Sequence, residues 1–157
     1  MTYWFTSDTH FGHNKIIEYC KRPFKSLEEM NETLIKNWNE VVKTDDTVFH
    51  LGDFSFRGFH TYKNRLNGNI ILVQGNHDSS EHTNIREMII NHGGKSWYLC
   101  HVPPETMPTQ YCLCGHIHER WKSKKRGNKV LVNVGVDVWG FRPVSIQSIL
   151  KEVDIAK

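Results

Sequence analysis

Five short clusters of aspartate, asparagine, histidine and glycine each lie at the end of an apolar, strand-like run, and this arrangement constrains the fold most. The clusters are Asp8 to His10, Gly52-Asp53, Gly75 to Asp78, His101, and Gly115 to His118. In open α/β sheets, ligands bind beyond the carboxyl ends of the strands. Five polar strand ends can converge on one cleft, so the pattern predicts an α/β chain built around such a cleft.

The segments between these clusters predict alternating strands and helices. Ser26 and Glu29 form a capping box, and the apolar residues behind them recur at helical spacing. Gly93-Gly94 is read as the stop of a third helix. The expected helices span 26–43, 59–66 and 83–92, with a short last helix capped by Ser145. The expected strands span 2–6, 47–51, 69–74, 95–101, 110–114 and 129–136.

Length and composition bound the class of protein. The 157 residues, 38% hydrophobic and 24% charged, fit one compact domain over 1–157. No apolar stretch approaches the ~18–20 residues that cross a bilayer, and the N-terminus lacks a signal-peptide layout. We therefore expect a cytoplasmic protein with no membrane partner. A net charge of +3 does not by itself imply a nucleic-acid surface, although it does not exclude one, and the basic run 122–129 is expected to be a solvated hairpin tip.

Histidine is unusually frequent in this chain. There are ten in 157 residues, and imidazole is the commonest metal ligand in proteins. His50 lies inside an apolar run and is expected to be a hydrogen-bonded core residue, whereas His60, His82 and His92 are expected on the surface. The four cysteines lack the spacing of a structural zinc site or a disulfide framework, so we expect buried free thiols.

The polar clusters carry the ligands of a divalent metal site. Carboxylate oxygens and imidazole nitrogens together suit manganese, iron, zinc and related ions, with no need for thiolate. Two ions a few ångströms apart need one shared anionic ligand, and Asp53 stands at a strand end from which it can bridge them. Gly52, Gly75 and Gly115 are expected to let the backbone turn sharply, so that the next side chain reaches inward.

The clusters resemble the five motifs of the calcineurin-like metallophosphoesterases, and they occur in the family's order over residues 8–118. Gly-Asn-His-Asp and Gly-His-x-His are moderately specific, whereas Gly-Asp alone carries little information. The chain resembles the small, single-domain bacterial and phage-type phosphoesterases of this family. The resemblance implies a four-layer αββα sandwich, in which helices flank two mixed sheets.

The resemblance also implies a site for two divalent metal ions. Manganese is expected first, with iron, nickel and zinc as alternatives, because ligand type does not separate these ions. The implied ligands are Asp8, His10 and His118 for one ion, Asn76, His101 and His116 for the other, and Asp53 for both.

Three residues of one motif are expected near the substrate. In the family pattern, His77 lies close to the substrate without binding metal, so it would protonate the departing oxygen or stabilise the transition state. Asp78 would orient His77, and Asn76 would contact the substrate as well as a metal ion.

Two further residues are candidates for substrate contact. The protein-phosphatase branch has a second aspartate where this chain has Phe56, which argues against protein-phosphatase activity. Arg57 remains, and it is either a phosphate contact or an exposed structural residue, since a guanidinium matches phosphate geometry. His13 either touches the leaving group or is simply a residue at a helix start.

The implied activity is hydrolysis of a phosphoester by in-line attack of a metal-activated hydroxide. The short chain leaves little room for a cap over a monoester, so we expect a phosphodiesterase, for which a nucleotide or cyclic nucleotide is a candidate substrate. The first alternative is a phosphomonoesterase or nucleotidase with the same site. The second is a non-catalytic scaffold similar to the retromer subunit of this fold, which the full ligand set with His77 argues against.

Overall fold

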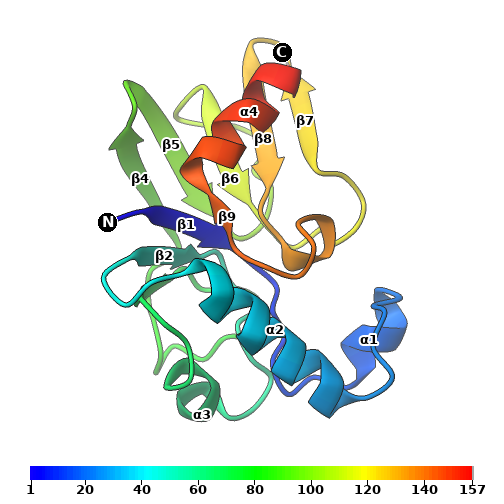
Figure 1. Ribbon diagram of the computed structural model, residues 1–157. Helices are drawn as coiled ribbons and strands as arrows, with labels where there is room; N and C mark the ends of the chain where they lie inside the picture. Colours follow the sequence, from blue (N-terminus) through cyan, green and yellow to red (C-terminus); the bar gives the residue numbers. More distant parts are fainter. Residues whose placement is uncertain (157) are drawn as a thin grey trace.

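Two mixed β-sheets packed face to face form the centre of the molecule (Figure 1), and the computed structural model describes residues 1–156. The strands are β1 (Tyr3–Thr6), β2 (Thr47–His50), β3 (Asn69–Leu72), β4 (Glu87–His92), β5 (Lys95–Cys100), β6 (Tyr111–Cys114), β7 (Ser123–Arg126), β8 (Lys129–Asn133) and β9 (Val144–Ser145). The helices are α1 (Lys15–Tyr19), α2 (Leu27–Val41), α3 (Phe59–Lys63), the 3₁₀ helix η1 (Val136–Val138) and α4 (Ile146–Ala156).

Strand direction brings the polar clusters to one edge. The first sheet has the order β3-β2-β1-β9, with β1, β2 and β3 parallel and β9 antiparallel to β1. The second has the order β4-β5-β6-β8-β7, with β5, β6 and β8 parallel. Because parallel strands end at the same edge, the segments after β1, β2 and β3 meet each other, as do those after β5, β6 and β8.

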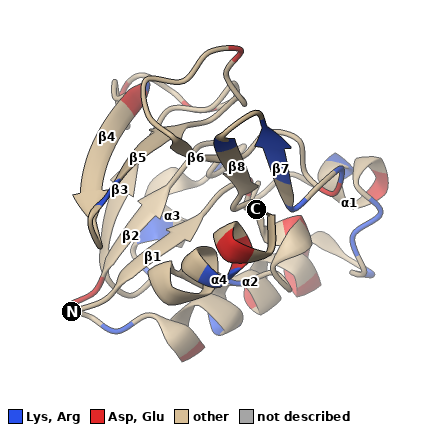
Figure 2. Ribbon diagram, turned by 90° about the horizontal axis from the view of Figure 1, so that it is seen from above, with Lys and Arg blue, Asp and Glu red and all other residues tan. Residues whose placement is uncertain are grey.

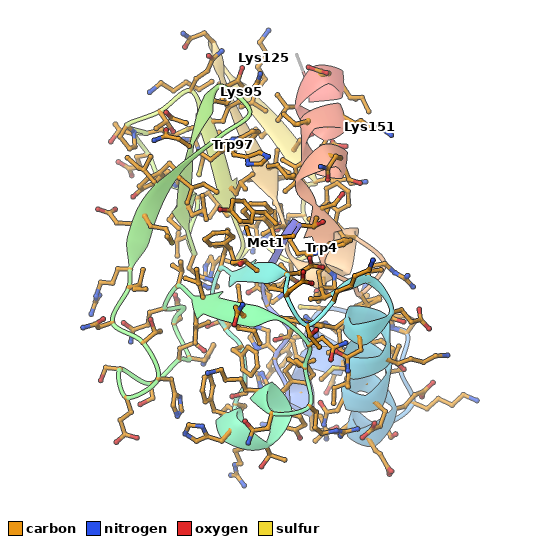
Figure 3. The ribbon with its side chains drawn as sticks, turned by 60° about the vertical axis from the view of Figure 1, so that its left-hand side comes forward. Met1, Trp4, Lys95, Trp97, Lys125 and Lys151 are labelled. Carbon is orange, nitrogen blue, oxygen red and sulfur yellow. The ribbon has the colours of Figure 1, made fainter. Side chains whose placement is uncertain are left out.

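The main hydrophobic core lies between the two sheets. Phe5 and Phe49 stack from β1 and β2, with ring centroids 5.2 Å apart. Trp97 on β5 is fully buried in the same cluster, and Figure 3 shows it among the packed side chains of the second sheet. Burying an aromatic side chain of this size contributes a large share of core stability.

Helix α2 covers the outer face of the first sheet. The side chain of Ser26 accepts a hydrogen bond from the backbone N–H of Glu29, which confirms the predicted cap. Trp38 is buried against Val48 and Leu72 of the sheet in a second hydrophobic cluster. The predicted helix over 59–66 is present as α3, which ends three residues earlier at Lys63. None of the helices within residues 1–156 is long and apolar enough to cross a membrane.

The last helix and the outer face of the second sheet complete the layers. Helix α4 follows β9 directly and packs on β7 and β8 (Figure 1). The outer face of the second sheet carries the buried thiols of Cys100, Cys112 and Cys114, packed against Met107. Cys20 is half-buried, and all four cysteines are free. The structure confirms the predicted fold class of two mixed sheets with flanking helices.

The predicted helix over 83–92 is wrong, because this segment contains strand β4. It pairs with β5 in an antiparallel hairpin, in which His92 lies opposite Lys95. Met88 and Ile90 are half-buried against the core, whereas Glu87, Ile89 and Asn91 are exposed. This alternation has the period of a strand. Gly93 and Gly94 both have positive φ angles, so they form the hairpin turn instead of ending a helix.

The basic run 122–129 lies in a hairpin, but most of it is strand β7 and not the predicted tip. Strand β7 pairs antiparallel with β8, with Arg126 opposite Lys129, so only the two residues between them form the turn. Figure 2 shows basic residues, in blue, on the ribbon of β7, the last strand of its sheet. Exposed lysines on an edge strand discourage pairing with other chains, so a role in solubility explains them.

Candidate metal centre

The strand ends bring six of the seven predicted metal ligands into two groups. Within each group the candidate ligand atoms lie within 4.8 Å of one another. Asn76 is exposed and lines a pocket of about 460 Å³ together with His101. The two groups are Asp8, His10 and His118, and Asp53, His101 and His116.

Asp8 divides its two carboxylate oxygens between two tasks. Its Oδ2 accepts hydrogen bonds from the Ser7 hydroxyl at 2.7 Å and from the backbone N–H of His116 at 2.8 Å. Its Oδ1 lies 3.6 Å from His10 Nε2 and 3.9 Å from His118 Nε2. One oxygen therefore fixes the carboxylate in place while the other faces the imidazoles.

Asp53 lies between the two groups and is held in a similar way. Its Oδ1 accepts a hydrogen bond from the backbone N–H of His77 at 2.9 Å. Its Oδ2 lies 3.2 Å from His101 Nε2 in one group and 3.6 Å from His10 Nε2 in the other. A single oxygen of Asp53 thus faces histidines of both groups, which is the position that a bridging ligand requires.

Several atoms that face this space are buried and lack a hydrogen-bond partner. Among residues 1–156, they include Asp8 Oδ1, His10 Nε2 and His101 Nε2. Leaving a buried polar atom unsatisfied costs about 1–3 kcal/mol, and more for a charged group, so three such atoms aimed at one space need an explanation. Oxygen and imidazole donors of this kind suit borderline divalent cations. The residues therefore fit metal ions.

The histidines are oriented from behind. The Nδ1 atom of His101 lies 2.7 Å from the carbonyl oxygen of Leu51, which directs Nε2 at Asp53. In the same way, His10 Nδ1 lies 3.2 Å from His13 Nδ1. Metal-ligating histidines almost always use their second ring nitrogen in this way. Burial disfavours the charged form of His101, yet the carboxylates of Asp53 and Asp8 raise its pKa to about 9.

Most of the grouped residues have strained backbones. Positive φ angles are uncommon outside glycine and cost energy that the surrounding structure must supply. Within the described chain, only seven non-glycine residues have them, and five belong to the two groups. Strain concentrated in this way is a mark of functional sites. The five are Asp8, His10, Asp53, His116 and His118, with φ angles between 51° and 74°.

Glycines let the loops approach closely, although not always by turning. Only Gly52 of the three predicted turn glycines has a positive φ, of 104°. A Cβ at Gly75 would lie 2.3 Å from the backbone N of Asp53, and one at Gly115 would lie 2.4 Å from Asp8 Oδ2. Gly75 and Gly115 are therefore needed for space beside the two aspartates.

Three polar residues whose side chains are buried support the site and were missed from the sequence. Arg22 donates to the backbone carbonyl oxygens of Asp8 and Thr9, and its guanidinium also pairs with Asp137 at 2.7 Å. Asp137 in turn lies 3.8 Å from His118 Nδ1. Asn133 donates hydrogen bonds to two carbonyls of the loop that carries His118. These residues stand alone in the sequence and belong to no recognisable motif. Only their burial and hydrogen bonds in the folded protein identify them as supporting residues.

His77 and Asp78 lie beside the two groups. The ring of His77 is exposed, and its centroid lies 5.8 Å from that of His10. Both carboxylate oxygens of Asp78 accept hydrogen bonds from backbone N–H groups of Asp53, Phe54 and Gly75. Within the described chain Asp78 makes no hydrogen bond to the His77 ring. It positions the loop of Asp53 instead, so the expected contact with His77 is not present.

Arg57 and His13 line one further pocket, of about 340 Å³. The Arg57 guanidinium is exposed and lies 5.6 Å from the centre of the Phe56 ring, with no hydrogen bond to the described residues. His13 is half-buried, and its contact with His10 means that it supports a ligand as well as facing the pocket. The two residues therefore share one pocket, and His13 connects that pocket to the candidate ligand His10.

The remaining histidines serve the fold. His50 is fully buried. Its Nε2 lies 2.9 Å from Thr9 Oγ1, and its Nδ1 accepts a hydrogen bond from the backbone N–H of Gly52. Burial lowers its pKa to about 4, so it is a neutral core histidine, as expected. His60 is exposed, whereas His82 and His92 are half-buried and pack on Phe59 and Tyr3.

Two mixed sheets with carboxylate and histidine groups at their strand ends are the arrangement of a metal-dependent phosphoesterase. The similarity of this chain to known proteins agrees with this class. Residues 1–150 match the calcineurin-like phosphoesterase superfamily domain, so the chain belongs to this superfamily.

An uncharacterised protein of Methanocaldococcus jannaschii is 36% identical over 162 residues, covering 96% of this chain and 90% of the relative. The crystal structure of a protein of unknown function from Aquifex aeolicus aligns with a TM-score of 0.76 at 27% identity, covering 96% of this chain and 98% of that one. An archaeal phosphodiesterase aligns with a TM-score of 0.54 at 18% identity, covering 93% and 99% of the two chains, which shows a shared fold.

Proposed function

We propose that this protein is a phosphodiesterase that depends on two divalent metal ions, manganese first among them. The observation that carries the proposal is the position of Asp53 Oδ2, 3.2 Å from His101 Nε2 and 3.6 Å from His10 Nε2. Asp8, His10 and His118 would hold one ion, Asn76, His101 and His116 the other, and Asp53 both. When bound, such ions act as Lewis acids that stabilise charge on the phosphoryl oxygens and lower the pKa of water.

The chain's own residues would position the substrate and move a proton. The exposed amide of Asn76 can donate a hydrogen bond to a phosphoryl oxygen, since it shares a pocket wall with His101. An imidazole N–H of His77 would donate a proton to the oxygen of the leaving group. Asp78 would keep the Asp53 loop in place through its three backbone hydrogen bonds.

The surroundings of the centre favour a diester over a monoester. One pocket is lined in part by Asn76 and His101, and a second is lined in part by His13. A phosphodiester carries two organic substituents, and these two pockets offer a place for each. A monoester would leave one of them without an occupant.

A comparison of two substrates tests the ester type. With manganese present, we expect bis-p-nitrophenyl phosphate to be hydrolysed with a higher kcat/KM than p-nitrophenyl phosphate. The reverse order would show a phosphomonoesterase. Absence of hydrolysis of both by metal-loaded protein would contradict the enzyme proposal and leave the scaffold alternative.

A further inference from the structure

An exposed aromatic ring lies close to the candidate metal centre. Phe56 follows β2 in the same loop as Asp53, and its backbone N–H donates to the carbonyl oxygen of Phe11. Its neighbour Phe54 is fully buried, whereas Phe56 is 51% exposed. Single exposed apolar side chains are common on protein surfaces, so the position of this ring beside the candidate metal centre, and not its exposure, makes it a candidate contact for a ligand.

A chain of ring contacts connects Phe56 to the metal ligands. The centroid of the His13 ring lies 5.3 Å from that of His10 and 5.0 Å from that of Phe56. His13 and Phe56 are nearly parallel, with an angle of 19° between their planes. Because His13 Nδ1 is also in contact with His10, the orientation of the Phe56 ring is coupled to that of a ligand. The exposed ring is therefore connected to the candidate ligand His10 through the His13 ring.

The pocket around this ring combines an aromatic surface with positive charge. It measures about 340 Å³ and is lined by Gly12, His13, Asn14, Lys15, Phe56 and Arg57. Lys15 and Arg57 are both exposed, and neither has an ion-pair partner within residues 1–156. The Arg57 guanidinium lies 5.6 Å from the centre of the Phe56 ring, so charge and aromatic surface are in contact. Flat π surfaces beside cations that lack an ion-pair partner are the elements with which proteins hold the bases and phosphates of nucleotides.

We propose that this pocket, named here the Phe56 pocket, binds the aromatic base of a nucleotide substrate by stacking on Phe56. The phosphoester would lie at the metal centre, the sugar beside His13, and the base on the exposed part of the Phe56 ring, with Lys15 and Arg57 available to further phosphates. This inference rests on the proposed phosphodiesterase function and narrows its substrates to nucleotide esters.

Binding of two matched ligands tests the inference without turnover. The ligands are the phosphonate analogues of AMP and of ribose phosphate, in which carbon replaces the ester oxygen, so neither can be hydrolysed at that bond. Calorimetry on manganese-loaded protein should show a Kd about 5- to 150-fold lower for the AMP analogue, the range that stacking of one base contributes. Equal affinities would overturn the proposal.

Variants then locate the contact. Phe56→Ala should remove most of this ratio, Phe56→Trp should keep it, and Phe56→Leu, which is apolar but has no π face, should lose most of it. Ile89→Ala is the matched control, because Ile89 is also 51% exposed but lies on β4 in the other sheet. The proposal would be overturned if the ratio of the two Kd values were unchanged in Phe56→Ala, including the case in which both ligands bind equally more weakly.

The hydrolysis of bis-p-nitrophenyl phosphate by the unaltered protein tests the proposed function separately from the stacking of a base on Phe56. If the protein hydrolyses this diester but binds both analogues with equal Kd values, only the stacking inference is wrong. Failure of the proposed function would show as no hydrolysis, whatever the two Kd values are.

Discussion

Asp8 and Asp53 are anchored in the same way, although they come from different strands. Each accepts a hydrogen bond from a backbone N–H with one carboxylate oxygen and turns the other toward histidine nitrogens. The anchoring N–H groups belong to His116 and His77, which are themselves in predicted motifs. Each aspartate is thus held by the backbone of another part of the site, so the loops position one another.

The bridging position of Asp53 predicts that metal and activity are lost together. Asp53→Asn removes the negative charge that both groups share and should lower kcat/KM by more than the roughly 10–100-fold expected when an outer-shell partner is removed. Elemental analysis of the purified variant should show fewer than two ions per chain. Asp45→Asn is the matched control, since Asp45 is exposed and outside the site. An active Asp53→Asn protein with full metal content would refute the bridging role.

His77 should separate catalysis from metal binding. Its exposed ring belongs to neither ligand group, so His77→Ala should keep its metal while kcat falls about 10²–10⁴-fold for a poor leaving group. If His77 is an acid, the loss should be smaller for p-nitrophenolate, which departs without a proton. A similar loss for both leaving groups would show charge stabilisation instead. A variant stripped of metal would mean that His77 is a ligand.

Gly115 should matter for metal binding through space alone. A Cβ there would lie 2.1 Å from Ser7 Oγ and 2.4 Å from Asp8 Oδ2, so Gly115→Ala must displace the Asp8 carboxylate. We expect manganese affinity to fall at least about tenfold, within the range for disturbed ligand support. Gly127→Ala is the control, because a Cβ at Gly127 meets no atom within 4 Å although its φ is 59°. It should lower stability slightly and leave metal affinity unchanged.

The buried, neutral His50 predicts a loss of stability in weak acid. Its pKa is lowered from 6.5 to about 4 by burial, so the unfolded chain takes up a proton before the folded one does. Stability is therefore full above pH 6.5 and falls as the pH drops toward 4, by on the order of 2 kcal/mol at pH 5. Urea unfolding at pH 7 and pH 5 should show this drop, and His50→Gln should show less of it. An equal drop in both proteins would exclude His50 as the cause.

The sequence predicts which residues gather at the site because each motif is local and follows a strand. Residues that act across long separations are not predictable in this way. Arg22 and Asp137 are 115 positions apart and become partners only when the segment after α1 meets the 3₁₀ helix η1. The role of Asp78 was misread for the same reason, since its hydrogen bonds cross to the Asp53 loop. The error at β4 arose because Gly93-Gly94 fits both a helix end and a hairpin turn.

The metal stoichiometry of the unaltered protein decides whether the two ligand groups form a dinuclear centre. Metal-free protein titrated with manganese and followed by calorimetry should bind two ions per chain, and a chelator should abolish hydrolysis of bis-p-nitrophenyl phosphate until manganese is restored. Two ions are expected because Asp53 Oδ2 faces His10 of one group and His101 of the other. Binding of no divalent ion, or hydrolysis that continues in excess chelator, would contradict the account.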